Sequence, residues 1–175
     1  MTRITTKSTN RNSTETGFTL LELLLIVAVV MIASAMAIPA AHSAIASYQL
    51  DAAVDSATGA VQAARYQAIM HGYMYQIDFN SATNQFQVSS EIPPSASFST
   101  VSNPVPISGS PVTMGVGAAN QNSAGHLILQ LKPNGSILVS SGQSMPVPLT
   151  IAYNGTTIHL TVSNYGAISK YSTTP

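Results

Sequence analysis

The sequence predicts an α+β fold in which one long N-terminal helix is followed by antiparallel strands. Three observations predict it: a charge-free apolar stretch near the N-terminus, a 3.6-residue apolar period that continues to His71, and a period of two that begins at Tyr73. Such an arrangement packs as an α+β roll, with the amphipathic half of the helix covering one face of a C-terminal antiparallel β-sheet.

The composition restricts the class of protein. The 175 residues suit a single domain, and only 7% of them are charged, against about 25% in typical globular chains. Six Lys and Arg balance six Asp and Glu, so the clustered cations of a nucleic-acid-binding protein are missing and no nucleic-acid partner is expected. The absence of cysteine excludes a disulfide scaffold, a thiolate nucleophile and a cysteine zinc site.

The apolar N-terminal stretch is long enough to cross a membrane. Leu23 to Leu50 contains no formal charge and would be roughly 42 Å long as a helix, against about 30 Å for the hydrocarbon core. Its apolar side chains favour insertion by about 4–7 kcal/mol, which exceeds about 3 kcal/mol for one central ion such as Glu22. Arg3, Lys7 and Arg11 precede the stretch and favour a cytoplasmic N-terminus. The sequence therefore predicts a single-pass protein of the cytoplasmic membrane whose globular part lies outside the cytoplasm.

Three interpretations of this N-terminus compete. An ordinary secretory signal would be cut at the A-x-A site formed by residues 35–37, and a generic signal anchor would remain uncut. Both leave Glu22 unexplained, although an acid inside an apolar segment is usually functional. The third interpretation treats the run GFTLLELLLIVAVVMIASAMAIP, Gly17 to Pro39, as one unit.

That run resembles the class III signal of type IV prepilins and type II secretion pseudopilins. The resemblance implies that residues 1–17 are a leader, which prepilin peptidase removes by cutting between Gly17 and Phe18, and that Phe18 is then N-methylated. It implies that Glu22 pairs with the N-terminal amine of a neighbouring subunit during assembly; on chemistry alone, Glu22 could merely cap its own helix. Pro39 matches a proline that kinks the helix in this family, and residues 18–41 become the transmembrane and assembly helix.

The helix is expected to continue from residue 42 to residue 72. An apolar stripe recurs at steps of four and three, while Asp51, Asp55, Gln62 and Arg65 fall off it. The small side chains in the stripe favour close packing against a sheet over a coiled coil, and Gly72 is a plausible stop. The stripe consists of Leu50, Val54, Ala57, Val61, Ala64 and Ala68.

Residues 73–175 are expected to form a β-rich globular domain. Alternation predicts a first hairpin, a stretch from 90 to 125 with no sustained period beyond a short strand at 112–116, and a final meander closed by the turn Asn154-Gly155. The predicted strands are 73–79 and 85–89 in the hairpin, then 126–131, 136–140, 149–153, 156–163 and 167–171.

The C-terminal half resembles the GspH/FimT group of minor pseudopilins and minor pilins. The resemblance rests on a strand that leads into Pro133-Asn134-Gly135 and on a later hairpin that ends at Gly166-Ala167-Ile168. In the family a glycine-arginine step stands at this second place, and DNA-binding members use a basic C-terminal region. Here only Lys132 and Lys170 are available, so DNA uptake is not expected.

Catalytic and metal signatures are weak, so no enzyme activity, metal or cofactor is expected. His42, His71, His126 and His159 show no zinc-binding spacing, and a calcium loop would need carboxylates that are missing from Ile92 onward. His126 and His159 could meet across strands, although a hydrogen-bonded or exposed histidine is more typical.

These observations favour a minor pseudopilin of a type II secretion system that assembles into a periplasmic pseudopilus. Its expected partners are prepilin peptidase, the membrane and other pseudopilins or pilins, contacted through their N-terminal helices. Two alternatives remain: a minor pilin of a type IV pilus, and a secreted β-rich binding protein cut after Ala37.

Overall fold

The computed structural model describes residues 17–109, 111–117, 125–140 and 145–173. The chain divides after Ala41 into two compact units, Met1–Ala41 and His42–Pro175, each of which is described by itself. Arg3, Lys7 and Arg11, the cations of the predicted leader, lie outside the described residues.

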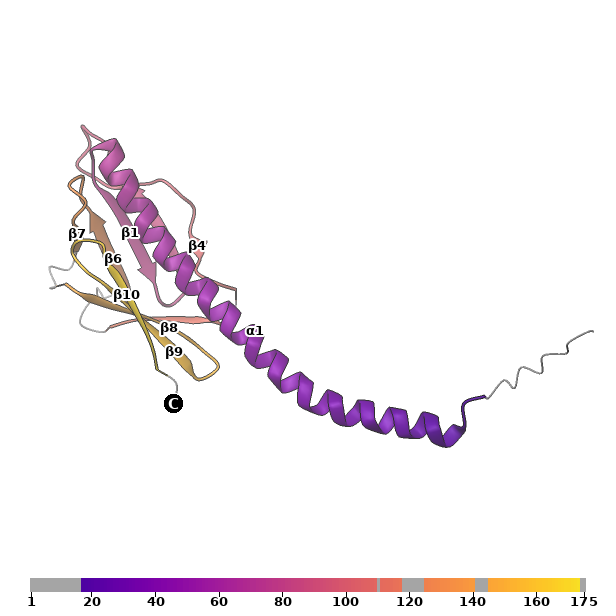
Figure 1. Cartoon of the computed structure of the whole chain (residues 1–175). Coiled ribbons are helices and arrows are strands. Elements are labelled where there is room, and N and C mark those ends of the chain that lie inside the picture. The colour runs from indigo at the N-terminus through magenta and orange to yellow at the C-terminus, as the bar shows by residue number, and fades with distance from the viewer. Residues whose placement is uncertain (1–16, 110, 118–124, 141–144, 174–175) are drawn as a thin grey trace, which may run out of the picture. The chain divides into compact units, whose positions relative to one another are not determined.

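One helix, α1 (Leu20–His71), belongs to both units (Figure 1). Its start lies within two residues of the predicted one, and it continues through Pro39 without interruption. The helix ends where Gly72 adopts a φ of 75° and donates its N–H to the carbonyl of Ala68 at 3.1 Å. The positive φ is open to glycine without steric strain, which explains the predicted stop.

In the unit formed by residues 42–175, one face of α1 is buried along its length. All six residues of the predicted stripe are buried, and Ala46 and Ala53 join them. Five of these eight side chains are alanines, so the helix backbone can approach the strands closely. The stripe therefore packs against sheets, as predicted.

The first sheet contains the predicted hairpin and the first half of the predicted meander. The strand order is β3-β2-β1-β6-β7, with β4 also paired to β2. The pairs β1–β2 and β1–β6 are antiparallel, with Phe79 opposite both Phe86 and Leu127. The strands are β1 (Tyr75–Asn80), β2 (Gln85–Ser90), β3 (Ser99–Thr100), β4 (Val105–Pro106), β6 (His126–Leu131) and β7 (Ile137–Val139).

The second sheet contains the remaining strands in the order β10-β9-β8-β5. The β8–β9 hairpin turns at Asn154-Gly155, where both residues have positive φ, as a type I′ turn requires. Ile158, Leu160 and Val162 are buried, while the residues between them face the other way, as predicted. The strands are β5 (Thr113–Val116), β8 (Val147–Tyr153), β9 (Thr156–Val162) and β10 (Ile168–Thr173).

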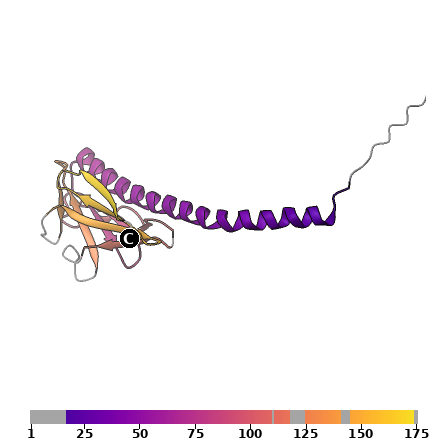
Figure 2. The ribbon, with the colours of Figure 1, turned by 60° about the horizontal axis from the view of Figure 1, so that its bottom comes forward.

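The predicted single sheet is thus two sheets, which share one core with α1 (Figure 2). Val61 from the helix, Leu129 from the first sheet and Leu160 from the second line one internal gap of only about 10 Å³. The two sheets are also joined by a hydrogen bond from the N–H of Ile137 to the carbonyl of Asn164, at 2.8 Å. The meander changes sheets between β7 and β8, which local periodicity cannot reveal because it reports faces and not partners.

Candidate functional site

The start of α1 is fixed by Thr19. Gly17, Phe18 and Thr19 lie outside the helix, which begins at Leu20. The N–H of Glu22 donates both to the Thr19 carbonyl at 3.1 Å and to Thr19 Oγ1 at 3.2 Å. The Thr19 carbonyl also accepts the N–H of Leu23 at 3.1 Å. Thr19 is therefore the N-cap residue, and its spacing to Glu22 is that of a capping box.

Gly17 has no structural reason within the described chain to be glycine. Its φ lies outside the positive range that favours glycine, and a Cβ built on it would meet nothing within 4 Å. The next residue, Phe18, is 76% exposed. The peptide bond between Gly17 and Phe18 is thus accessible and lies outside the helix, which begins two residues after Phe18.

Glu22 places an exposed carboxylate in the first turn of α1. The positive end of the helix dipole favours an anion there. Glu22 stands among apolar side chains, with Leu21 before it and Leu23 after it. The predicted processing residues Gly17 and Phe18 and the predicted assembly residue Glu22 therefore lie together at one helix end, whereas Pro39 lies far along the helix.

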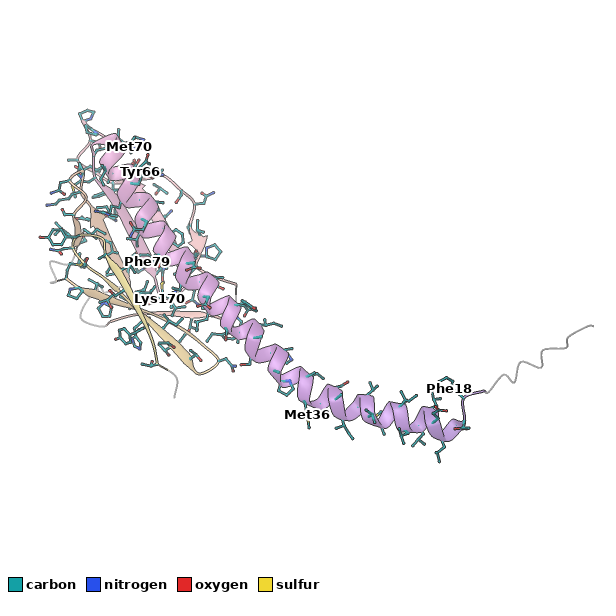
Figure 3. The ribbon with its side chains drawn as sticks, in the orientation of Figure 1. Phe18, Met36, Tyr66, Met70, Phe79 and Lys170 are labelled. Carbon is teal, nitrogen blue, oxygen red and sulfur yellow. The ribbon has the colours of Figure 1, made fainter. Side chains whose placement is uncertain are left out.

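The helix between Leu20 and Ala41 exposes an apolar surface on every side. None of its residues is buried, and its side chains project all round the axis from Phe18 to Met36 (Figure 3). Within the described residues, α1 is the one helix long and apolar enough to cross a membrane, by length and composition. Exposed apolar surface of this extent marks a site that contacts lipid or other proteins. Together with Phe18, which directly precedes the helix, the large apolar side chains of this surface are Leu20, Leu21, Leu23, Leu24, Leu25, Ile26, Val27, Val29, Val30, Met31, Ile32, Met36 and Ile38.

In the globular unit, two polar side chains tie α1 to a turn of each sheet. Arg65 Nε donates to the Gly135 carbonyl in the β6–β7 turn at 2.9 Å, and Gln62 Nε2 donates to the Gly166 carbonyl in the β9–β10 turn at 2.9 Å. Gln62 and Arg65 fall off the apolar stripe of the helix, and the contacts that they make were not predicted from the sequence. A signal was available, because Arg65 is the one cation in residues 20–71 and the two turns carry glycines.

The histidines on the strands do not meet, because they lie in different sheets. His126 Nδ1 is 2.8 Å from both carboxylate oxygens of Asp78, beside a hollow of about 80 Å³ lined by residues of β1, β2 and β6. His159 stacks on Tyr171 at 4.7 Å between ring centroids. Among the residues that the structure describes, no group of three or more His, Asp or Glu side chains could hold a metal ion.

Comparison with known proteins supports the fold. No protein-family model matches the chain, and no curated protein sequence matches it. Among solved structures, the chain is similar to the minor pseudopilin EpsH from the type 2 secretion system of Vibrio cholerae, with a TM-score of 0.53 and 10% identity. The match covers 71% of this chain and 97% of the other. The chain therefore has a pseudopilin-like α+β fold.

Proposed function

We propose that this chain is a minor pseudopilin of a type II secretion system. It is made as a precursor, anchored in the cytoplasmic membrane by residues 18–41, cut between Gly17 and Phe18 by prepilin peptidase, and methylated on Phe18. The mature subunit then joins a periplasmic pseudopilus. The observation that carries the proposal is the start of α1. There an accessible Gly17–Phe18 bond precedes an exposed apolar helical segment, residues 20–41, with one carboxylate in its first turn.

The exposed apolar side chains of the helix stabilise the subunit both in the membrane and in a filament. In the membrane its apolar side chains are solvated by lipid. In a filament they exchange lipid for the equivalent helices of other pilin-like subunits, so the apolar surface never faces water. The pseudopilin-like fold, with a globular unit at the other end of the same helix, supports this role.

Glu22 makes assembly depend on cleavage. Hydrolysis of the Gly17–Phe18 bond creates a new amine, and a carboxylate in apolar surroundings is stabilised by such a cation. In our proposal the Glu22 carboxylate of an incoming subunit pairs with the Phe18 amine of its neighbour. An uncut precursor has no amine at this position and therefore lacks the partner.

The proposal predicts that Glu22→Leu is inserted and cut normally but fails to assemble. Breaking one ion pair in apolar surroundings costs about 3–5 kcal/mol, so incorporation into filaments should fall by at least about tenfold. Incorporation is measured by cross-linking to other pilin-like subunits and by recovery in sheared filament fractions. Ser34→Leu is the matched control, because Ser34 is another exposed polar residue of the same helix, and this variant should assemble like the unchanged protein. Wild-type incorporation of Glu22→Leu would contradict the pairing.

A further inference from the structure

We propose that Thr19 is a positioning residue for processing: its cap sets the start of α1 at Leu20 and so keeps the Gly17–Phe18 peptide bond outside the helix. This inference rests on the proposed function, because it concerns the same cleavage. The reaction itself needs only water, which adds across the bond to give the Gly17 carboxylate and the Phe18 amine.

The cap matters because the first backbone N–H groups of α1 need hydrogen-bond acceptors. The N–H groups of the first turn have no partner within an α-helix, and in apolar surroundings an unpaired N–H is costly. Thr19 satisfies the N–H of Glu22 through both its hydroxyl and its carbonyl, at 3.2 and 3.1 Å.

Without this hydroxyl, the N–H of Glu22 keeps only the Thr19 carbonyl, three residues back. The acceptor that a regular α-helix would offer instead is the carbonyl four residues back. In a helix extended toward the N-terminus, the N–H of Glu22 bonds to the Phe18 carbonyl and the N–H of Leu21 bonds to the Gly17 carbonyl. The Gly17 carbonyl belongs to the bond that is cut. Extension of α1 by one turn would therefore fold that bond into the helix, where a peptidase cannot bind it as extended chain.

The surroundings of Gly17 independently indicate that this segment serves a partner outside the chain. Neither the φ of Gly17 nor any neighbour within 4 Å requires a residue without a side chain. A flexible residue directly before the cut bond allows close approach of another protein. However, glycine also leaves the backbone free to adopt several conformations. In this proposal the Thr19 cap excludes the helical one.

The test compares the initial rate of cleavage of the full-length precursor by prepilin peptidase in membrane vesicles. Thr19→Val keeps the shape of threonine but removes the acceptor, whereas Thr19→Ser and Thr19→Asn keep capping ability with different shapes. Loss of an N-cap corresponds to about 1 kcal/mol, so Thr19→Val should be cut roughly fivefold more slowly. Thr19→Ser and Thr19→Asn should stay within about twofold of the unchanged precursor.

A second readout reports the helix start directly. The carbonyl carbon of Gly17, labelled with ¹³C in the uncut precursor, should move toward helical chemical shifts in Thr19→Val and not in Thr19→Ser. Cleavage of Thr19→Val at the wild-type rate would overturn the inference. It would also be overturned if Thr19→Ser and Thr19→Asn were as slow as Thr19→Val, because the peptidase would then recognise threonine itself. If the unchanged precursor were not cut after Gly17, the proposed function would fail as well, so the two failures are distinguishable.

Discussion

At the scale of single residues, Arg65 requires a glycine in each of the two turns that it contacts. A Cβ on Gly166 would lie 2.9 Å from Arg65 Cδ, and a Cβ on Gly135 would lie 3.2 Å from Arg65 Nη2. Both glycines also have positive φ, 77° and 79°. The two turns therefore leave room for the arginine side chain only because Gly135 and Gly166 have no side chain. This room lets both turns accept hydrogen bonds from the helix.

We expect Gly166→Ala to destabilise the protein. The left-handed conformation alone costs about 1–2 kcal/mol for a residue with a Cβ, and displacement of Arg65 adds to this. The matched control is Gly59→Ala, because Gly59 is helical and a Cβ there meets nothing within 4 Å. That control should stabilise the chain by about 0.5–1 kcal/mol. Urea unfolding of the full chain in detergent, followed by circular dichroism, measures both; equal stability of the two variants would contradict this account.

The hydrogen-bond acceptors of Gln62 and Arg65 could not be predicted from the sequence. The apolar stripe of the helix was predictable because its members lie three or four residues apart. The acceptor of Arg65 lies 70 residues away and that of Gln62 lies 104 residues away. Such partners depend on which turns reach the helix, which is decided by the packing of both sheets.

At the scale of elements, the junction between α1 and β1 is stabilised by an aromatic cluster. The rings of His71, Tyr73 and Tyr75 stack with centroid distances of 5.5 to 5.9 Å. Tyr75 Oη also lies 2.8 Å from His71 Nδ1. Burial raises the pKa of Tyr75 from 10.0 to about 12, and a hydrogen bond and charge repulsion from Tyr73 add to the increase.

This raised pKa predicts loss of stability at alkaline pH. Above pH 10 the unfolded chain releases the Tyr75 proton while the folded chain keeps it. The stabilisation is therefore fully present below pH 10 and falls as the pH rises toward 12. The difference in pKa corresponds to roughly 3 kcal/mol. Unfolding free energies measured from pH 9 to 12 should fall less steeply for Tyr75→Phe than for the unchanged protein. Tyr165→Phe, at a residue that is 76% exposed, should keep the wild-type slope; a wild-type slope for Tyr75→Phe would contradict the assignment.

Most elements could be predicted because their periodicity is local. The strand β6 matches its predicted range, and β1, β2, β5, β7, β8, β9 and β10 differ from theirs by a few residues at most. The strands β3 and β4 were missed, since two residues carry no period and Pro106 lacks an N–H. The division into two sheets was also missed, because β1 pairs with β6 across a long stretch of chain. Sheet membership is set by such distant pairing and by the shared core.

At the scale of the whole molecule, the net charge of zero is the sum of two segments, residues 1–17 and the rest of the chain, which are proposed to separate on cleavage. Removal of residues 1–17 would take away three cations and Glu15. Three Lys or Arg and five Asp or Glu would then remain, a side-chain charge of −2. In this account the cations orient the precursor in the membrane and leave with the leader. The nearly uncharged remainder is suited to packing against other subunits.

The N-terminus of the mature protein tests this account most directly. The chain is purified from the cytoplasmic membrane of cells that contain prepilin peptidase, and its N-terminal residues are identified by mass spectrometry. We predict a chain that begins at Phe18 and carries one methyl group on its amine. A mature chain that begins at Ile38, or one that retains residues 1–17, would contradict the central claim.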